Sequence, residues 1–333
     1  MEADSNLLAT IRAELDAAQS ILIVSHVRPD GDAVGSLLGL GLSLLAAGKH
    51  VQMVLSDGVP VNFRFLAGTE QVRKRPEGNI DYRIVVDASE IDRVGRALED
   101  QTAPDLNIDH HITNDHFARH NLVLGDAAAT AEILARVLPA MNLPITTAVA
   151  NALLTGMVTD TIGFRTGNVT PRVLRVAADL MERGALLASV YYQALIQRSS
   201  AAARFWGCGL NRLQVEDGMV WTSLTMADRR ASEYSGRDDA DLINVLSALQ
   251  GVDLALIFVE QPGNCIKISW RVCGQADVDA DVSAVALQFG GGGHRAAAGA
   301  EVSGGLKTVQ EKVLVATQLY LNQLRAAKMT PVA

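Results

Sequence analysis

The feature that most constrains this sequence is an uninterrupted apolar run followed directly by polar residues. Ile21–Val24 is short, rich in β-branched residues and free of charge, which predicts a strand buried on both faces. His26, Asp30 and Asp32 follow around a Pro-Asp-Gly turn, and an apolar helical segment begins at Ala33. Functional groups of parallel α/β sheets collect at the carboxyl ends of the strands, so this loop is a candidate cation site. Pro-Asp-Gly is also strong turn chemistry, and the loop alone supports a plain surface turn equally well.

Strands and helices alternate from this loop to about Gly184. The alternation predicts an α/β fold in which a parallel sheet carries helices on both faces. Ser5 can cap a helix that precedes the first strand. The predicted strands are 21–24, 51–55, 83–86 and 106–108, and the predicted helices are 33–47, 130–141, 146–158 and 171–184.

A second, smaller α/β domain is predicted after a helical connector. We divide the chain into an N-terminal domain of residues 1–189, a connector of residues 190–205 and a C-terminal domain of residues 206–333. The second domain has predicted strands at 212–215, 219–225, 252–259 and 265–272, and predicted helices at 239–249, 282–289 and 306–326.

Composition and charge exclude several classes of protein. The chain has 333 residues and a formal net charge of −8, which argues against a broad basic face that grips long nucleic acid. A short anionic substrate held by bound cations is compatible with that charge. The three cysteines are odd in number and form no C-x-x-C pair, so we expect no disulfide framework and a cytoplasmic location. We also expect no secretory signal and no membrane span, because no apolar run approaches the ~20 residues that a span requires.

Acidic and histidine residues recur after the later elements. Asp87 follows the predicted strand 83–86, Asp109-His110-His111 follows the strand 106–108, and Asp160 closes a predicted helix. Each residue alone has an ordinary explanation as a helix cap, a turn residue or part of a polar loop. Together they would bring several carboxylates to one edge of one sheet, where like charges disfavour mutual ionisation unless cations neutralise them.

The donor types indicate which cations these would be. Mixed carboxylate and imidazole ligands suit a first-row divalent ion such as Mn²⁺ better than an all-oxygen Ca²⁺ site. Four aspartates and two histidines are about what two ions sharing one bridging carboxylate require. Two such ions about 3.5–4 Å apart are the usual arrangement for hydrolysing a phosphate ester.

The order of these motifs resembles a known family. H-x-x-x-D-x-D, V-V-D, D-H-H and T-D-T-I-G-F-R occur in the order of the DHH phosphoesterase superfamily. Downstream, Gly290–Ala300 (G-G-G-G-H-R-A-A-A-G-A) resembles the glycine-rich motif of the DHH-associated C-terminal domain. Together they resemble the nanoRNase/pAp-phosphatase branch, whose two-domain members degrade short oligonucleotides and 3′-phosphoadenosine 5′-phosphate (pAp).

The resemblance implies a role for each motif residue. One Mn²⁺ would be held by His26, Asp30 and Asp87, and the other by Asp32, Asp87, His110 and Asp160, with Mg²⁺ or Co²⁺ as substitutes. Asp109 would orient the neighbouring histidine, and His111 would face the substrate phosphate or leaving group. The alternative for the whole set is a nucleotide sensor that keeps the fold without catalysis.

The glycine-rich loop is the candidate substrate anchor. Its glycines would turn backbone N–H groups toward an anion, and the residues that follow offer an imidazole and a forked cation. Arg271 resembles a family position that meets the terminal phosphate, although an ordinary surface arginine is equally compatible, and Arg165 is a weaker candidate. The predicted anchor residues are Gly291, Gly292, Gly293, His294, Arg295 and Arg271.

Substrate length follows from what the chain lacks. Long single strands need a basic groove with stacking aromatics, whereas aromatics are 5% of this acidic chain. We expect Phe289 and Trp270 to serve the core rather than to stack on bases. The sequence thus predicts a Mn²⁺-dependent hydrolase of short oligonucleotides or pAp, with no duplex or membrane partner, for which a homodimer would be unsurprising. The alternative substrate is another small phosphate, such as a cyclic dinucleotide, pyrophosphate or polyphosphate.

Overall fold

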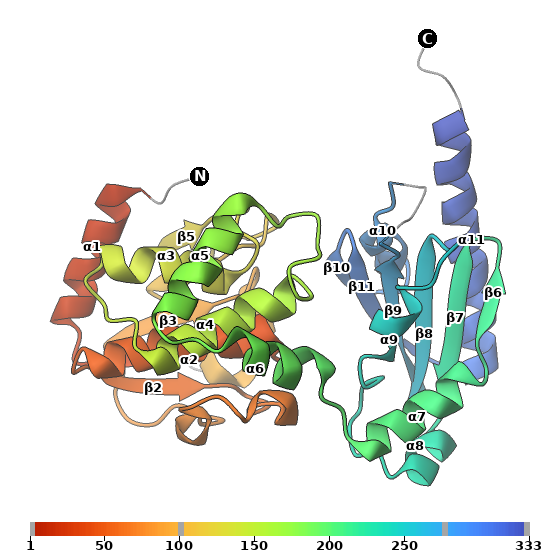
Figure 1. Ribbon diagram of the computed structural model, residues 1–333, viewed down its shortest axis with the longest axis horizontal. Coiled ribbons are helices and arrows are strands. Elements are labelled where there is room, and N and C mark those ends of the chain that lie inside the picture. Colours follow the sequence, from red (N-terminus) through yellow and green to blue (C-terminus); the bar gives the residue numbers. More distant parts are fainter. Residues whose placement is uncertain (1–3, 99–102, 275–278, 330–333) are drawn as a thin grey trace. The chain divides into compact units, whose positions relative to one another are not determined.

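The computed structural model describes residues 4–98, 103–274 and 279–329 of the 333-residue chain. The contacts between Cα atoms divide the chain into two compact units, Met1–Gln197 and Arg198–Ala333. We describe each unit separately (Figure 1).

The first unit is built on a five-stranded sheet in which every pair of neighbouring strands is parallel. The strand order β2-β1-β3-β4-β5 confirms the predicted parallel sheet. The last strand was not predicted, because His120-Asn121-Leu122-Val123 contains no apolar run. The strands are β1 (Ser20–Val24), β2 (His50–Val54), β3 (Tyr82–Val86), β4 (Leu106–Asp109) and β5 (His120–Val123).

The two faces of this sheet are covered differently. One face packs against α-helices in a large core to which Ile21 and Ile23 of β1 contribute. Leu22 and Val24 point to the opposite face, where the described core residues come from strands, from the 3-10 helix η3 (Ile91–Leu98) and from neighbouring loops. We predicted helices on both faces of the sheet. On this second face, the helical cover is the short 3-10 helix η3. The α-helices of the first core are α1 (Ser5–Ala17), α2 (Gly31–Ala46), α3 (Thr130–Ala140), α4 (Thr147–Asp160) and α5 (Pro171–Glu182).

Glycines set the spacing between α2 and α4. A Cβ atom on Gly35 would lie 2.5 Å from the Ala152 carbonyl oxygen and 2.8 Å from the Gly156 nitrogen. A Cβ atom on Gly156 would lie 2.6 Å from Asp32 Oδ1. Because such approaches are possible only without side chains, these glycines hold the start of α2 close to the end of α4.

The second unit is a six-stranded mixed sheet of order β10-β11-β9-β8-β7-β6, in which β7 and β8 are the parallel pair. One core lies under α10 and α11, and another lies under α7 and α9. The strands are β6 (Gln214–Glu216), β7 (Met219–Leu224), β8 (Leu254–Gln261), β9 (Cys265–Val272), β10 (Gly292–His294) and β11 (Ala297–Ser303). The helices are α7 (Ser200–Leu210), α8 (Met226–Ser232), α9 (Leu242–Leu246), α10 (Val282–Leu287) and α11 (Leu306–Met329).

Local capping changes two details of the predicted helices. Asp4, not Ser5, caps α1, since its carboxylate accepts the Asn6 N–H at 2.8 Å. The predicted connector helix is interrupted, because α6 (Leu187–Tyr191) and the π-helix η4 (Tyr192–Ile196) end before Ser199, whose side chain caps α7. In the ranges that the structure describes, no helix combines the length and the apolar character needed to cross a bilayer.

Candidate metal centre

The motif residues of the first unit gather at the carboxyl edge of its parallel sheet. Loops after β1 and β3 carry His26 and Asp87, and the Asp109-His110-His111 motif begins at the last residue of β4. The start of α2 and the end of α4 supply three further aspartates. Their side chains form three overlapping groups whose candidate ligand atoms lie within 4.8 Å of one another. The groups are His26, Asp30 and Asp87; Asp32, His110 and Asp160; and Asp87, His110 and His111.

Asp87 connects these groups. Its Oδ2 lies 3.6 Å from His26 Nε2, and its Oδ1 lies 3.8 Å from His110 Nε2. These separations are too long for hydrogen bonds and suit donor atoms that share a cation. The residue also has a left-handed backbone (φ 57°), a conformation that aspartate tolerates better than most side chains and that clusters at functional sites. One oxygen of Asp87 thus faces His26, and the other faces both His110 and His111, whose Nδ1 lies 3.9 Å from it.

The backbone fixes the first histidine. His26 is buried, and its Nδ1 lies 2.9 Å from the Val27 carbonyl oxygen. A proton on Nδ1 can satisfy that carbonyl, which leaves the Nε2 lone pair directed toward Asp87 and Asp30. The Nε2–Asp30 Oδ1 distance is 3.9 Å.

Asp30 has a structural role as well. Its Oδ1 accepts the N–H groups of Asp32 and Ala33, at 3.0 and 3.1 Å, and so caps α2. The cap explanation and the ligand explanation of this residue are thus compatible, because a carboxylate has a second oxygen and several lone pairs.

Asp32 is held by the beginning of another helix. The N–H groups of Thr130 and Ala131, at the start of α3, donate to its Oδ2 and Oδ1 at 2.6 and 3.0 Å. Ser36 adds a hydroxyl at 3.2 Å. The Thr130 hydroxyl lies 3.0 Å from Asp87 Oδ1, so the first residue of α3 contacts both carboxylates.

His111 is positioned by a buried polar network. Its Nδ1 lies 2.6 Å from Asp109 Oδ1, while Asn114 Nδ2 donates to Asp109 Oδ2 at 2.6 Å. Asn114 Nδ2 also lies 2.8 Å from Asn107 Oδ1, and the Asn107 amide reaches the Ala88 carbonyl. Sequence reasoning missed both asparagines, although a polar residue inside the apolar segment L-N-I-D was a usable signal.

The ligand set brings several carboxylates close together. Burial raises the pKa of Asp32 well above its ordinary value, and the charges of Asp87 and Asp160 raise it further. Burial likewise raises the pKa of Asp160, with Asp30 and Asp87 adding to the effect. Burial by itself would lower the pKa of His26, but its contacts with Asp30 and Asp87 outweigh burial and raise that pKa to about 10. Burial and like charge therefore disfavour the ionised forms of Asp32 and Asp160, whereas burial would raise the pKa of Asp30 but its contact with His26 lowers it. The mixed oxygen and nitrogen donors of the set fit divalent first-row metals.

The glycine-rich part of the predicted anchor lies at one edge of the sheet of the second unit. Gly292, Gly293 and His294 form β10, which pairs with β11. Gly293 has a left-handed φ of 145°, and a Cβ atom on it would lie 2.5 Å from the Ala297 carbonyl oxygen. A Cβ atom on Gly291 would collide with the Gly299 carbonyl oxygen, whereas Gly292 has open space. Packing alone therefore explains why Gly291 and Gly293 lack side chains, whether or not a ligand binds there.

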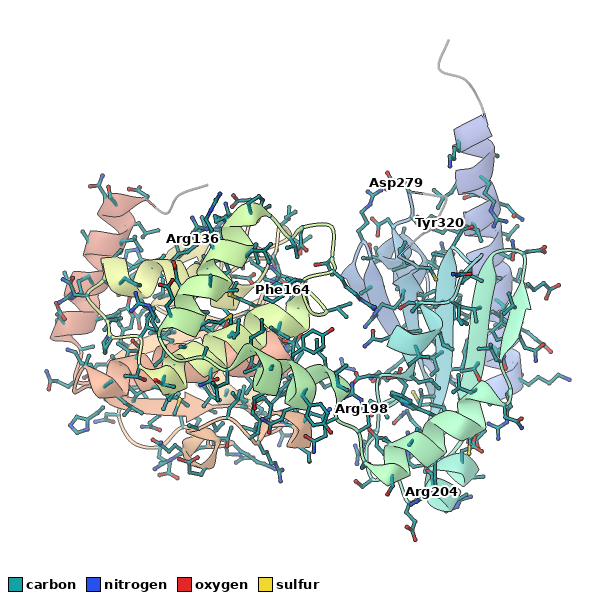
Figure 2. The ribbon with its side chains drawn as sticks, in the orientation of Figure 1. Arg136, Phe164, Arg198, Arg204, Asp279 and Tyr320 are labelled. Atoms are coloured by element: carbon teal, nitrogen blue, oxygen red, sulfur yellow. The ribbon has the colours of Figure 1, made fainter. Side chains whose placement is uncertain are left out.

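The two candidate anchor arginines, Arg271 and Arg295, already have protein partners. The exposed Arg295 pairs with Asp279, which Figure 2 labels. Arg271 is half-buried on β9, and its Nη1 donates to the Trp270 carbonyl oxygen at 3.0 Å. Burial lowers the pKa of Arg271, although the charges of Asp239 and Asp241 act to raise it. Trp270 is fully buried, as expected, and its ring lies 6.2 Å from that of Phe289.

Arg165 stands apart from these residues. It is exposed in the turn that follows α4, and its backbone N–H donates to the Thr161 carbonyl oxygen. Within the described ranges, no side-chain hydrogen bond or ion pair ties Arg165 to the ligand groups.

Comparison with known proteins gives the family. The model of the DHH family, N-terminal domain, matches residues 20–157, from β1 to just before Asp160. A bifunctional oligoribonuclease and PAP phosphatase of Thermus thermophilus is 33% identical over 314 residues, covering 90% of this chain and 89% of the relative. The namesake from Mycoplasma genitalium is 29% identical over 290 residues, covering 85% of this chain and 88% of the relative.

A solved structure agrees with the fold. An exopolyphosphatase-related protein from Bacteroides fragilis matches with a TM-score of 0.87 and 23% identity, covering 97% of this chain and 98% of that one. The chain belongs to the DHH family. It is an enzyme of the phosphoric ester hydrolase class.

Proposed function

We propose that this enzyme hydrolyses short oligonucleotides and pAp with two Mn²⁺ ions bound at the carboxyl edge of the parallel sheet. The observation that carries the proposal is Asp87, whose two carboxylate oxygens face His26 and His110 respectively. A carboxylate placed between two ligand groups is what a pair of adjacent ions requires. The two relatives above are named for oligoribonuclease and PAP phosphatase activities, which supports this substrate class.

The ligand assignment follows the three side-chain groups. His26, Asp30 and Asp87 would hold one ion, and Asp32, His110, Asp160 and Asp87 would hold the other. Ions bound there supply Lewis-acid stabilisation of phosphoryl oxygens and lower the pKa of water.

The chain's own residues do the positioning. Thr130 and the first N–H groups of α3 orient Asp32 and Asp87, so the carboxylates keep their directions when a phosphate is bound. Asp109 contacts Nδ1 of His111, so Nε2 of His111 is left to transfer a proton to the leaving-group oxygen of the substrate. Asp109 itself is fully buried and acts on the substrate only through His111.

The second unit would bind the substrate's terminal phosphate. We assign catalysis to residues 1–189 and substrate anchoring to residues 206–333, with Arg271, His294, Arg295 and the backbone of Gly291–Gly293 as the anchor. The open space at Gly292 supports an approach to the backbone there. Substrates would be short, because the chain is acidic and poor in aromatic residues.

One parallel assay tests this proposal. With Mn²⁺ present, pAp, a short RNA, a cyclic dinucleotide and pyrophosphate are supplied separately, and released phosphate and mononucleotide are measured. We expect turnover of pAp and of the short RNA. Turnover confined to pyrophosphate or to the cyclic dinucleotide would contradict the substrate assignment. Binding of pAp without any hydrolysis would instead identify a nucleotide sensor.

A further inference from the structure

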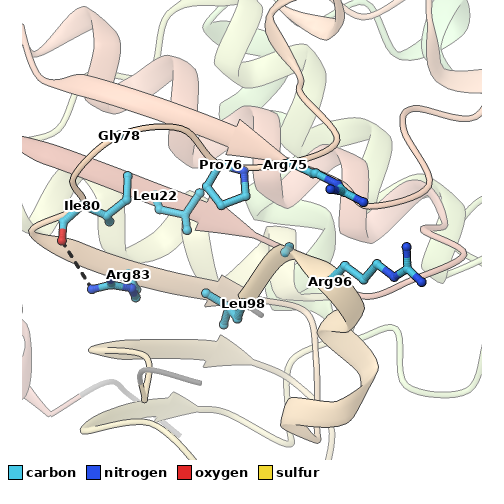
Figure 3. Close-up of a pocket in the computed structure, with 9 residues that line it drawn as sticks. Leu22, Arg75, Pro76, Gly78, Ile80, Arg83, Arg96 and Leu98 are labelled. Atoms are coloured by element: carbon cyan, nitrogen blue, oxygen red, sulfur yellow. Dashed lines mark hydrogen bonds between the residues drawn. The ribbon is translucent and has the colours of Figure 1, made fainter. Parts of the chain in front are cut away.

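A cavity of about 200 Å³ lies on the face of the parallel sheet that the α-helices leave uncovered (Figure 3). Leu22 of β1 and Arg83 of β3, which are neighbours in the sheet register, contribute to its lining. Both residues precede a metal-centre residue by four positions, Leu22 before His26 and Arg83 before Asp87. Four residues of extended strand span about 13 Å, so Leu22 and Arg83 lie well away from the metal-centre residues that follow their strands.

The charged side chains of the cavity are all basic. Arg75, Arg83 and Arg96 line it, and none of the described lining residues is acidic. In Figure 3, Arg75 and Arg96 lie at one end, while Arg83 lies near Ile80, to whose carbonyl oxygen it donates at 3.3 Å. An arginine has five N–H donors, so a contact with the protein leaves donors for a ligand. The charge of the lining residues is therefore positive, whereas the chain as a whole has a net charge of −8.

The rest of the lining is apolar. Leu22, Pro76, Ile80, Ala97 and Leu98 surround the space between the arginines. Guanidinium groups bind phosphate oxygens through paired hydrogen bonds, whereas an apolar wall favours an uncharged ring. The ligand that satisfies both parts is a small organic phosphate.

We propose that this cavity is a second anion site that binds a nucleoside monophosphate. Its phosphate would lie at the end formed by Arg75 and Arg96, and its base or sugar would contact Leu22, Pro76 and Leu98. This site needs no metal and is independent of the proposed function, because none of its residues belongs to the metal centre.

Calorimetric titration of the full chain with adenosine monophosphate tests the site. EDTA in the buffer keeps cations away from the metal centre. We expect binding to the unmodified chain, with adenosine giving no heat and inorganic phosphate binding more weakly. The double variant Arg75→Gln, Arg96→Gln should weaken binding at least about tenfold, because it removes two charge-assisted contacts.

Arg73→Gln is the matched control. Arg73 precedes Arg75 on the same segment but pairs with Glu77 at 2.5 Å and does not line the cavity, so binding should be unchanged. Arg75 is exposed, so the single variant Arg75→Gln decides the question if the double variant does not fold. Absence of binding, equal binding by the arginine variants, or phosphate binding as tightly as adenosine monophosphate would overturn the proposal.

Discussion

The metal centre and the glycine-rich hairpin differ in how far the protein has arranged them before any ligand binds. At the candidate metal centre, helix N–H groups orient Asp30 and Asp32, and the carboxylate oxygens of the set face imidazole nitrogens across 3.6–3.9 Å. In the hairpin β10–β11, Arg295 is exposed and already paired with Asp279. Under the proposed function, a cation would relieve the repulsion among the carboxylates of the first region, whereas a substrate at the second region would have to replace the protein partner of Arg295.

This difference predicts where substitutions act. Substitutions at the candidate metal centre should lower the rate of the chemical step and the affinity for cations, because its side chains are the proposed cation ligands. Changes at the hairpin should alter substrate affinity only. The four predictions below test that contrast, starting with the largest expected effect.

Asp87→Asn should lower kcat by at least about 10³-fold, because it weakens a ligand that both cation groups share. Asparagine tolerates the left-handed backbone of this position, so the fold should survive. Steady-state kinetics and metal analysis measure the two losses, and the increase in Tm that Mn²⁺ gives the unmodified protein should disappear. Asp179→Asn, an exposed change on α5, is the control. Full Mn²⁺-dependent turnover by Asp87→Asn would contradict the two-metal proposal.

Gly156→Ala should lower activity by about 10²-fold and destabilise the fold by about 1–3 kcal/mol, as overpacking does in cores. The new methyl group would lie 2.6 Å from both Asp32 Oδ1 and Ala131 Cβ, and would push the start of α2 away from α4. Kinetics and denaturant unfolding measure the two effects. Gly207→Ala is the matched control, because Gly207 is also helical but has open space, so it should gain about 0.5–1 kcal/mol. Unchanged activity in Gly156→Ala would show that helix spacing does not set the centre.

Asn114→Ala should lower kcat by about 10–100-fold and leave KM nearly constant, since outer partners of metal-site residues have effects of this size. The side chain orients Asp109, which in turn orients His111, so the substitution affects the reaction without removing a substrate contact. The separate measurement of kcat and KM distinguishes positioning from binding. A rise in KM at constant kcat would contradict this role.

Arg295→Gln should raise KM by roughly tenfold with kcat unchanged, as expected for one charge-assisted phosphate contact. Asp279→Asn is the complementary change, because it releases Arg295 from its ion pair and should lower KM by a few-fold. Initial rates over a range of pAp concentrations measure both. If the two substitutions leave KM unaltered, the hairpin arginine does not anchor the substrate.

Much of the first unit follows from local sequence patterns. Ile21–Val24 and Ile84–Val86 are apolar runs that polar residues follow directly, and the carboxyl edge of a parallel sheet brings such ends together. The gathering of His26, Asp87 and His110 was therefore predictable, although their roles as ligands stay a prediction.

Other features depend on contacts between distant segments. The N–H groups that hold Asp32 come from Thr130 and Ala131, nearly one hundred residues away, and no local pattern predicts that pairing. The ion pair of Arg295 with Asp279 is likewise set by how the hairpin folds back. His120–Val123 shows the same limit for the fold, because its place beside β4 and not its composition makes it a strand.

The helix cap and the proposed ligand role of Asp30 would together join folding to cation binding. One oxygen of its carboxylate already accepts the N–H groups of Asp32 and Ala33, so the first turn of α2 and the metal centre share a single side chain. A cation that fixes this carboxylate also fixes the two amides that it caps. Hydrogen exchange at the amides of Asp32 and Ala33 should therefore slow when Mn²⁺ is added. The first turn of α2 would then show whether a cation is bound.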